Sequence, residues 1–239
     1  MRASLRALYH ELPRRFAGGL LNTLFPEGNI CHLCGCPLQG EAEVFLCDLC
    51  AEALLCAHIP NSDQPLSIHE LLPCAVAAYL YHSPAQELVH NLKYRGDATA
   101  AAPLAQAMAR AFACVNSPEL RRAELLIPIP LHPRREESRG FNQAALIAEC
   151  LSGHIGLAHY PRALERIRYT RSQVNAASRE RRLKNMIGAF TVADIPLIYK
   201  KHVLLVDDVC TTGATAIACA HVLLACGAKE VSLLTACRA

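Results

Sequence analysis

The sequence contains no tryptophan, and aromatic residues make up only 5% of its 239 residues. An obvious aromatic platform for stacking a nucleobase is therefore missing. The chain also has no apolar run of the ~18 residues that a membrane-spanning helix needs. Arginines interrupt residues 1–25, so this segment lacks the continuous apolar stretch of a signal peptide. These absences predict a cytoplasmic protein with no membrane insertion.

Strong charge of one sign is missing as well. The formal net charge is +3 and the isoelectric point is near 8.2, which argues against a strongly basic coat protein for nucleic acid but leaves room for a local basic groove. Neither a Walker motif nor a dinucleotide-binding GxGxxG motif is present. Hydrophobic residues reach 52%, so the chain can bury a sizeable core.

Short apolar runs alternate with helical patterns from Ala75 onward. We expect strands at 75–81, 125–130, 202–206 and 230–237, and helices at 83–94, 98–113, 141–151 and 214–226. Ser83 is the expected N-cap of the first of these helices, with Pro84 at its first position. This alternation predicts an α/β domain with a mostly parallel sheet and flanking helices on both faces. Apolar residues at helical spacing also predict an amphipathic helix over 4–24, interrupted by Pro13.

Five of the thirteen cysteines lie between residues 31 and 50. Two CxxC pairs can each bind one side of a tetrahedral Zn²⁺, and this spacing is typical of a structural site. The predicted ligands are Cys31, Cys34, Cys47 and Cys50. Cys36, Cys56, His32 and His58 are alternatives close by, and a group of buried thiols without metal is the plainer interpretation.

The segment "LLVDDVCTTGAT", residues 204–215, joins an apolar run to two acids and then to a Thr/Gly turn at a helix start. Backbone N–H groups at such a turn, together with the helix dipole, favour a phosphate. Neighbouring side chains on an extended segment point to opposite sides, so the acids are expected to contact hydroxyls or a cation beside the phosphate. A ribose 5-phosphate meets both demands. The plainer interpretation is a strand end with an acidic loop and a threonine N-cap.

Three basic segments lie upstream of this turn. A loop after residue 130 carries Arg134, Arg135 and Arg139, whose planar guanidinium groups suit a pyrophosphate leaving group, although a solvated basic loop has the same composition. Lys93, in "NLKYRGD", either contacts a phosphate or belongs to a helix C-terminus. Residues 166–185 are predicted to form a basic flap over a phosphorylated ligand or a nucleic-acid backbone, or else a solvated helix face.

"VLLVDDVCTTGAT" resembles the phosphoribosyl pyrophosphate (PRPP) loop of type I phosphoribosyltransferases. The resemblance implies that Asp207 and Asp208 hold the ribose hydroxyls, with Mg²⁺ bound alongside PRPP. It assigns the 5-phosphate to the turn residues Thr211, Thr212, Gly213, Ala214 and Thr215.

Together with "LKYRGD", "IPIPLHPRR", "RGFNQA" and "RIRYTRSQ", this loop is similar to the ComF/GntX family over almost the whole chain. The family implies a zinc module with an N-terminal helix over 1–60 and a type I phosphoribosyltransferase-like domain over 70–239. It also implies a function in natural transformation and the use of external DNA. For that function, the zinc module and the basic flap would offer a surface for single-stranded DNA, or for a competence helicase or another DNA-uptake protein. Two alternatives remain: a nucleobase phosphoribosyltransferase of purine or pyrimidine salvage, and a PRPP-sensing regulator. Contact of Arg179, Arg181 and Arg182 with DNA would favour the first function.

Overall fold

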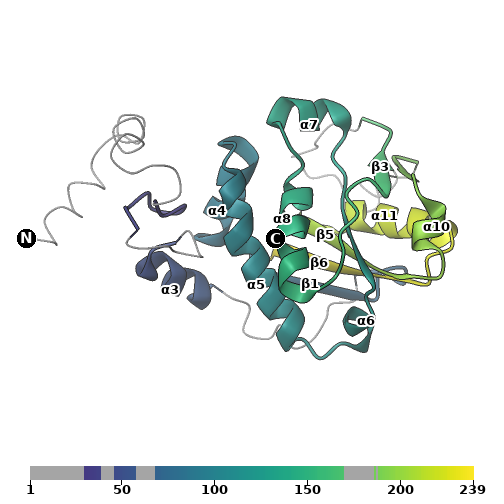
Figure 1. Cartoon of the computed structure of the whole chain (residues 1–239), viewed down its shortest axis with the longest axis horizontal. Helices are drawn as coiled ribbons and strands as arrows, with labels where there is room; N and C mark the ends of the chain where they lie inside the picture. Colours follow the sequence, from purple (N-terminus) through teal and green to yellow (C-terminus); the bar gives the residue numbers. More distant parts are fainter. Residues whose placement is uncertain (1–29, 39–45, 58–67, 170–185, 187) are drawn as a thin grey trace, which may run out of the picture. The chain divides into compact units, whose positions relative to one another are not determined.

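The computed structural model describes residues 30–38, 46–57, 68–169, 186 and 188–239. It divides the chain into two compact units, Met1–Cys56 and Ala57–Ala239 (Figure 1). The helix expected over 4–24 and the flap arginines Arg179, Arg181 and Arg182 lie outside the described residues. Within the described ranges, no helix is long and apolar enough to cross a membrane.

The part of the first unit that the structure describes contains a tight cysteine-rich turn and the helix α3 (Asp48–Cys56). In the turn, the Gly35 N–H donates to the Cys31 carbonyl at 2.7 Å, and the Cys31 N–H donates to the Cys36 carbonyl at 2.8 Å. Gly35 has a φ of 72°, a conformation that costs glycine little. The backbone is thereby folded back on itself so that Cys31, Cys34 and Cys36 are close together.

The second unit is built on a four-stranded parallel sheet with the order β1-β6-β5-β2. Its strands are β1 (Cys74–Leu80), β2 (Leu125–Pro128), β5 (His202–Cys210) and β6 (Glu230–Arg238). Because helices cover both faces of such a sheet, its strands are apolar over most of their length, and β2 is buried at every residue. The prediction of a mostly parallel sheet with flanking helices is confirmed.

Helices occupy both sides of this sheet (Figure 1). On one side, α5 (Ala101–Cys114) packs on β1 and β6, and α8 (Gln143–Ile155) packs on α5, β2 and β5. On the other side, α11 (Ala214–Ala225) packs on β6 and shares a core cluster with Val203, Leu205 and Leu233. Alternate residues of β5 therefore face different helices.

Shorter elements complete the unit. They are α4 (Ala85–Tyr94), η1 (Ala98–Ala100), α6 (Pro118–Arg121), α7 (Pro133–Arg139), α10 (Ile195–Ile198), and the antiparallel pair β3 (Leu164–Arg166) and β4 (Phe190–Val192). β4 contacts α11, so the small pair lies on the α11 side of the sheet.

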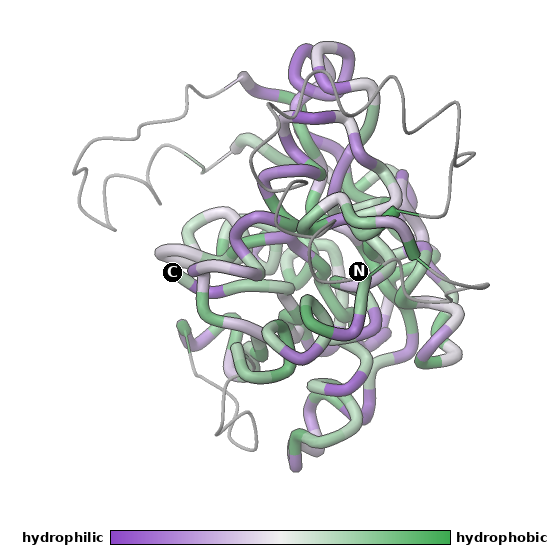
Figure 2. Tube along the Cα trace, turned by 90° about the vertical axis from the view of Figure 1, so that its left-hand side faces the viewer, coloured by the Kyte–Doolittle hydropathy of each residue, from purple (hydrophilic) through white to green (hydrophobic). Residues whose placement is uncertain are grey.

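Three local expectations are wrong. Residues 133–139, expected in a loop, form α7, because the His132 side chain accepts from the Arg134 N–H and Gly140, with a φ of 85°, ends the helix. α7 buries none of its residues and lies at the top of Figures 1 and 2, where its hydrophilic residues are purple. Pro84 rather than Ser83 precedes α4 as its cap, and β2 ends at Pro128 rather than at residue 130.

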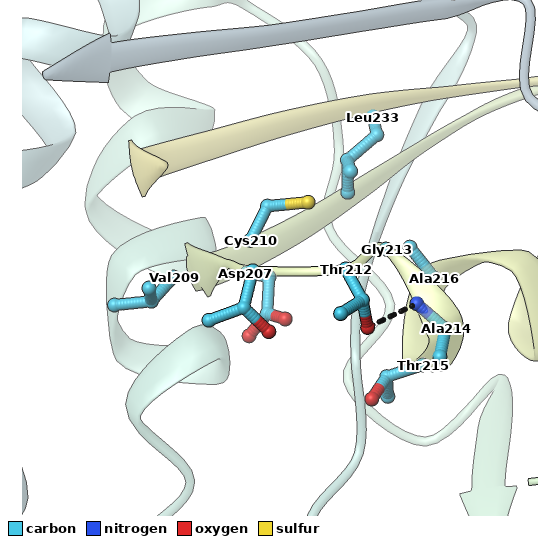
Figure 3. A pocket seen from close by; sticks show the side chains of 10 residues that line it. Asp207, Val209, Cys210, Thr212, Gly213, Ala214, Thr215, Ala216 and Leu233 are labelled. Atoms are coloured by element: carbon cyan, nitrogen blue, oxygen red, sulfur yellow. Dashed lines mark hydrogen bonds between the residues drawn. The ribbon is translucent and has the colours of Figure 1, made fainter. Parts of the chain in front are cut away.

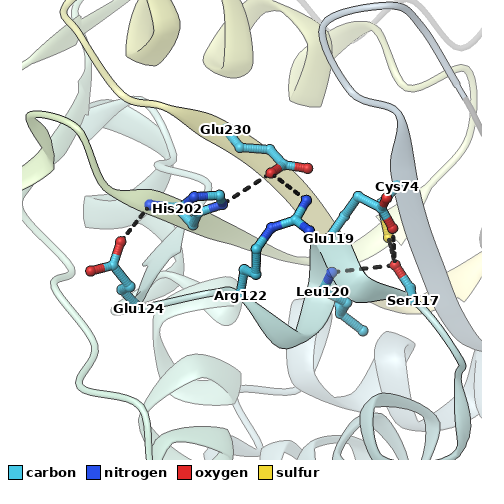
Figure 4. A network of polar contacts seen from close by, with 8 residues as sticks. All are labelled: Cys74, Ser117, Glu119, Leu120, Arg122, Glu124, His202 and Glu230. Atoms are coloured by element: carbon cyan, nitrogen blue, oxygen red, sulfur yellow. Dashed lines mark hydrogen bonds and ion pairs between the residues drawn. The ribbon is translucent and has the colours of Figure 1, made fainter.

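Charged side chains cluster where β5 and β6 begin (Figure 4). Glu230 accepts a hydrogen bond from Arg122 at 2.9 Å, and the His202 Nδ1 lies 3.0 Å from the same carboxylate. Glu124 accepts from the His202 backbone N–H at 2.9 Å. These contacts join the starts of neighbouring strands, so a ligand site is expected at their opposite, carboxyl ends.

Candidate functional site

A pocket lies at the carboxyl end of β5, in front of the first turn of α11 (Figure 3). Its walls include Asp207, the turn between strand and helix, and Leu233 of β6. Every predicted phosphate-binding residue lines it: Thr211, Thr212, Gly213, Ala214 and Thr215. The first N–H groups of a helix have no partners within the helix, so the first turn of α11 can donate to an anion in this pocket.

Gly213 holds the turn in a conformation that other residues rarely adopt. Its φ is 74°, and a Cβ built on it would lie 2.5 Å from the Cγ2 atom of Ile68. The Thr212 hydroxyl oxygen accepts from the Ala214 N–H at 3.4 Å, and the Ile217 N–H donates to the Gly213 carbonyl at 2.8 Å. Glycine therefore suits this position for two reasons: it adopts the positive φ easily, and its lack of a Cβ leaves room for Ile68.

The two acids face different surroundings, as the alternation of an extended segment predicts. β5 continues through both acids to Cys210, so Asp207 lies on the α11 side and Asp208 on the opposite side. Asp207 lines the pocket. Asp208 is 7% exposed, and its Oδ1 atom lies 2.8 Å from the Lys93 Nζ atom.

The Asp207 carboxyl has a strongly altered pKa. Burial raises it most, and the neighbouring Asp208 carboxylate raises it further. Lys93, the Asp208 N–H that donates to Asp207 Oδ1 at 2.9 Å, and Arg166 act in the opposite direction. The net effect is a pKa of about 7. Asp207 therefore titrates near neutral pH.

Arg166 was not singled out by the sequence analysis. It ends β3, is 7% exposed, and its guanidinium lies 5.5 Å from the centre of the Phe190 ring on β4. Burial lowers its pKa first and Arg135 second, whereas Asp207 raises it. Its only sequence signal was its place at the start of the basic run 166–185, which does not distinguish it from the other arginines there.

The predicted pyrophosphate contacts lie on or beside α7, around exposed tyrosines. The guanidinium groups of Arg134 and Arg135 lie 5.9 and 5.7 Å from the centre of the Tyr169 ring. Arg139 lies 5.6 Å from the Tyr94 ring. These distances are typical of cation–π contacts. Two of the arginines thus lie near the Tyr169 ring and the third lies near the Tyr94 ring. The aromatic content of 5% did not indicate that rings and arginines would lie together.

The "RGFNQ" segment fixes the connection from α7 to α8. The Asn142 side-chain Oδ1 accepts from the Ala144 N–H at 3.0 Å and so caps α8, while the side-chain Nδ2 donates to the Ile129 backbone carbonyl at 3.1 Å. Gln143, 1% exposed, accepts from Arg139 at 2.9 Å. This segment therefore ties α7 and α8 to the end of β2.

In the first unit, the sulfur atoms of Cys31, Cys34, Cys36 and Cys47 all lie within 4.8 Å of one another. None of the thirteen cysteines, all of which fall in the described ranges, forms a disulfide. Four thiolates at this spacing can hold a metal ion, because zinc binds cysteine sulfur at about 2.3 Å in a tetrahedron. The cluster contains three of the four predicted ligands, with Cys36 in addition.

Cys50, the fourth predicted ligand, lies beside this cluster on the first turn of α3. Burial raises the pKa of its thiol most, followed by the charge of Cys31 and hydrogen bonds with Cys47 and Cys34. For Cys47, burial raises the pKa, but hydrogen bonds from the Cys50 N–H and from neighbouring thiols outweigh it, so the pKa falls to about 7. Five sulfurs thus converge on a site that needs four.

Comparison with known proteins gives consistent matches. Residues 161–239 match the family described as the phosphoribosyl transferase domain. The DNA utilization protein YhgH of Salmonella typhimurium is 31% identical over 227 residues, covering 87% of this chain and 96% of that protein. Competence protein ComFC of Bacillus subtilis is 31% identical over 212 residues, covering 88% and 78%. Competence protein F of Haemophilus influenzae is 32% identical over 125 residues, covering 51% and 53%.

Proposed function

Since the chain belongs to the ComF/YhgH family and its residues 161–239 match the phosphoribosyl transferase domain, we propose that it binds PRPP and acts in the uptake and use of external DNA. The main support for this proposal is the pocket, because Asp207 and all residues of the turn 211–215 line it together. The turn offers N–H and hydroxyl donors to the 5-phosphate, and Asp207 offers an acceptor to the ribose hydroxyls. Mg²⁺ would bind with the pyrophosphate group of PRPP.

Calorimetric titration of PRPP with Mg²⁺ tests this function. We expect Asp207→Asn to weaken PRPP binding at least about tenfold, because a hydrogen bond to a charged group is worth about 1.5–3 kcal/mol. Glu149→Gln is the matched control, since it removes one exposed carboxylate from α8 and should leave binding unchanged. PRPP binding that is absent in the wild type, or equal in both variants, would refute the proposal. Pyrophosphate release with a panel of nucleobases would instead indicate salvage.

We also propose that α7, together with Tyr94 and Tyr169, binds single-stranded DNA. The support is the grouping of Arg134 and Arg135 around Tyr169, which is 45% exposed, and of Arg139 near Tyr94, which is 66% exposed. Single-stranded nucleic acid is bound by cations along its backbone and aromatic rings under its bases. A competence helicase or another DNA-uptake protein is the proposed protein partner, in the cytoplasm.

Fluorescence anisotropy with a labelled oligonucleotide tests the DNA surface. Changing Arg134 and Arg135 together to Gln should reduce the slope of log affinity against log salt by about 1.4, since each phosphate contact contributes about 0.7. Tyr169→Ala should weaken binding with the slope unchanged. Lys229→Gln removes an exposed positive charge at the far end of β6 and is the control. An unchanged slope in the double variant would exclude α7 from DNA binding.

For the first unit, we propose a structural Zn²⁺ held by Cys31, Cys34, Cys47 and Cys50. The two CxxC pairs support this set, whereas the four-sulfur cluster supports Cys36 as the fourth ligand. Zinc content measured after purification distinguishes them. Cys50→Ser should lose most of the zinc and Cys36→Ser should keep it, and the reverse result would assign Cys36.

A further inference from the structure

The end of β5 carries a buried ion pair that reaches across to another element. Lys93 lies in the last turn of α4, and its ammonium is 2.8 Å from Asp208 Oδ1. The two side chains are only 18% and 10% exposed. Burial alone would lower the pKa of Lys93, but Asp208 and then Asp207 raise it above its ordinary value. The amine is therefore held in its charged form beside Asp208.

Helix α4 fixes the position of this charge. Leu88, Val89 and Leu92 are fully buried on it, so the helix packs firmly within its unit. Lys93 follows directly after Leu92, and Asp208 lies on the face of β5 turned away from α11. An ion pair buried at both ends loses much of its solvation, and keeps its geometry because breaking it would leave a buried unpaired charge.

The formal charges around the acid pair sum to zero. When Asp207 is ionised, it and Asp208 contribute two negative charges, and Lys93 and Arg166, both of which act on Asp207, contribute two positive charges. Two adjacent carboxylates alone would repel both each other and a phosphate in the turn. In many proteins a bound divalent cation offsets such repulsion. Here the side chains of Lys93 and Arg166 supply the balancing positive charge.

We propose that Lys93, paired with Asp208 next to the pocket residue Asp207, takes the place of a divalent cation at the acid pair, so that ribose 5-phosphate binds without metal and Mg²⁺ is needed only for the pyrophosphate of PRPP. This inference rests on the proposed function and adds a ligand class to it: 5-phosphorylated ribose that lacks pyrophosphate. Lys93 is a positioning residue, because it acts through Asp208 and through its field on Asp207.

Isothermal titration of ribose 5-phosphate and PRPP, each with Mg²⁺ or with EDTA, tests the inference. For the wild type we expect the Kd of ribose 5-phosphate to differ less than about twofold between the two conditions, while PRPP should bind at least about tenfold more weakly in EDTA. Lys93→Met should weaken ribose 5-phosphate binding about tenfold or more in EDTA, with part of the loss recovered by Mg²⁺. Lys93→Arg should keep most of the metal-free binding.

A double variant separates charge balance from folding. Lys93→Met with Asp208→Asn removes both members of the pair and should bind ribose 5-phosphate in EDTA better than Lys93→Met alone, because no unpaired carboxylate remains. Far-ultraviolet circular dichroism would confirm that each variant is folded. Should a variant fail to fold, the wild-type comparison still decides the question.

The outcomes distinguish this inference from the proposed function. Wild-type protein that binds PRPP but needs Mg²⁺ for ribose 5-phosphate would overturn the role of Lys93 and leave the proposed function standing. Equal metal dependence in the wild type and Lys93→Met would do the same. Wild-type protein that binds neither ligand in either condition would overturn both.

Discussion

Asp207 and Asp208 are neighbours in the chain, yet one lines the pocket and the other is paired with Lys93. The pleat of β5 separates them, because consecutive side chains leave a strand on opposite faces. Asp207 is therefore accessible to a ligand in the pocket, whereas Asp208 pairs with the Lys93 ammonium. The resemblance assigns both acids to ribose hydroxyls, and that assignment stays a prediction for each of them.

The titration of Asp207 should make stability depend on pH. Its folded-state pKa of about 7 lies above the unfolded value of about 3.9, so the folded state keeps a proton that the unfolded chain releases. The free energy of unfolding should therefore decline as the pH rises from about 4 to about 7, by on the order of 4 kcal/mol from this group. Urea denaturation across this range measures the decline.

Asp207→Asn should lack this contribution, so its stability relative to the wild type should increase with pH through the same window. Glu149→Gln on the exposed side of α8 should follow the wild type. Parallel curves for the wild type and Asp207→Asn would show that Asp207 titrates at an ordinary pKa.

Gly213→Ala should destabilise the protein by about 1–3 kcal/mol, because the residue has a φ of 74° and the new Cβ would lie 2.5 Å from Ile68 Cγ2. Combining it with Ile68→Ala should cost less than the sum of the two single changes, since the clash is removed and only the backbone strain remains. Gly153→Ala is the control: it lies inside α8 with nothing within 4 Å, and should stabilise the protein slightly. Additive costs would mean that Ile68 does not limit the turn.

At the scale of elements, the connection between α7 and α8 depends on Asn142. Asn142→Ala removes the cap of α8 and the bond to the Ile129 carbonyl, so a loss of about 1–2 kcal/mol is expected. Asn142→Ser keeps a capping hydroxyl and should lose less. Chemical denaturation of the three proteins gives the order, and equal losses for Ala and Ser would indicate that the cap contributes little.

Helix α7 shows that hydrophobic periodicity alone does not predict every helix of this chain. "PRREESR" has no apolar periodicity, so a loop was expected, but a histidine cap and a glycine end suffice to close a short helix on the surface. In contrast, α5 and α8 carry apolar residues at helical spacing and were predicted within a few residues of their bounds.

At the scale of the whole molecule, two compact units predict two separable unfolding events. The division of the chain into a zinc module over 1–60 and a phosphoribosyltransferase-like domain over 70–239 remains our proposal. A strong zinc chelator should remove the stability of the first unit, since a small metal module gains about 10 kcal/mol or more from its ion. The parallel sheet of Ala57–Ala239 has its own core and should stay folded.

Differential scanning calorimetry with and without the chelator measures this, and the expected result is loss or lowering of one transition only. Cys114→Ser is the matched control, because Cys114 is an exposed thiol at the end of α5, far along the chain from the cysteine cluster. A single transition that moves as a whole on chelation would show that the units unfold together.

Local patterns in the sequence are enough to predict the parallel sheet, the turn at 211–215 and the grouping of cysteines. These patterns are short apolar runs between helical segments, a glycine at a helix start, and pairs of cysteines at fixed spacing. The contact of Lys93 with Asp208, the effect of Arg166 on Asp207 and the packing of the α7 arginines against tyrosines follow from the fold alone. These contacts join residues that are far apart in the chain, and they exist only once strand order and helix packing have placed the elements beside one another.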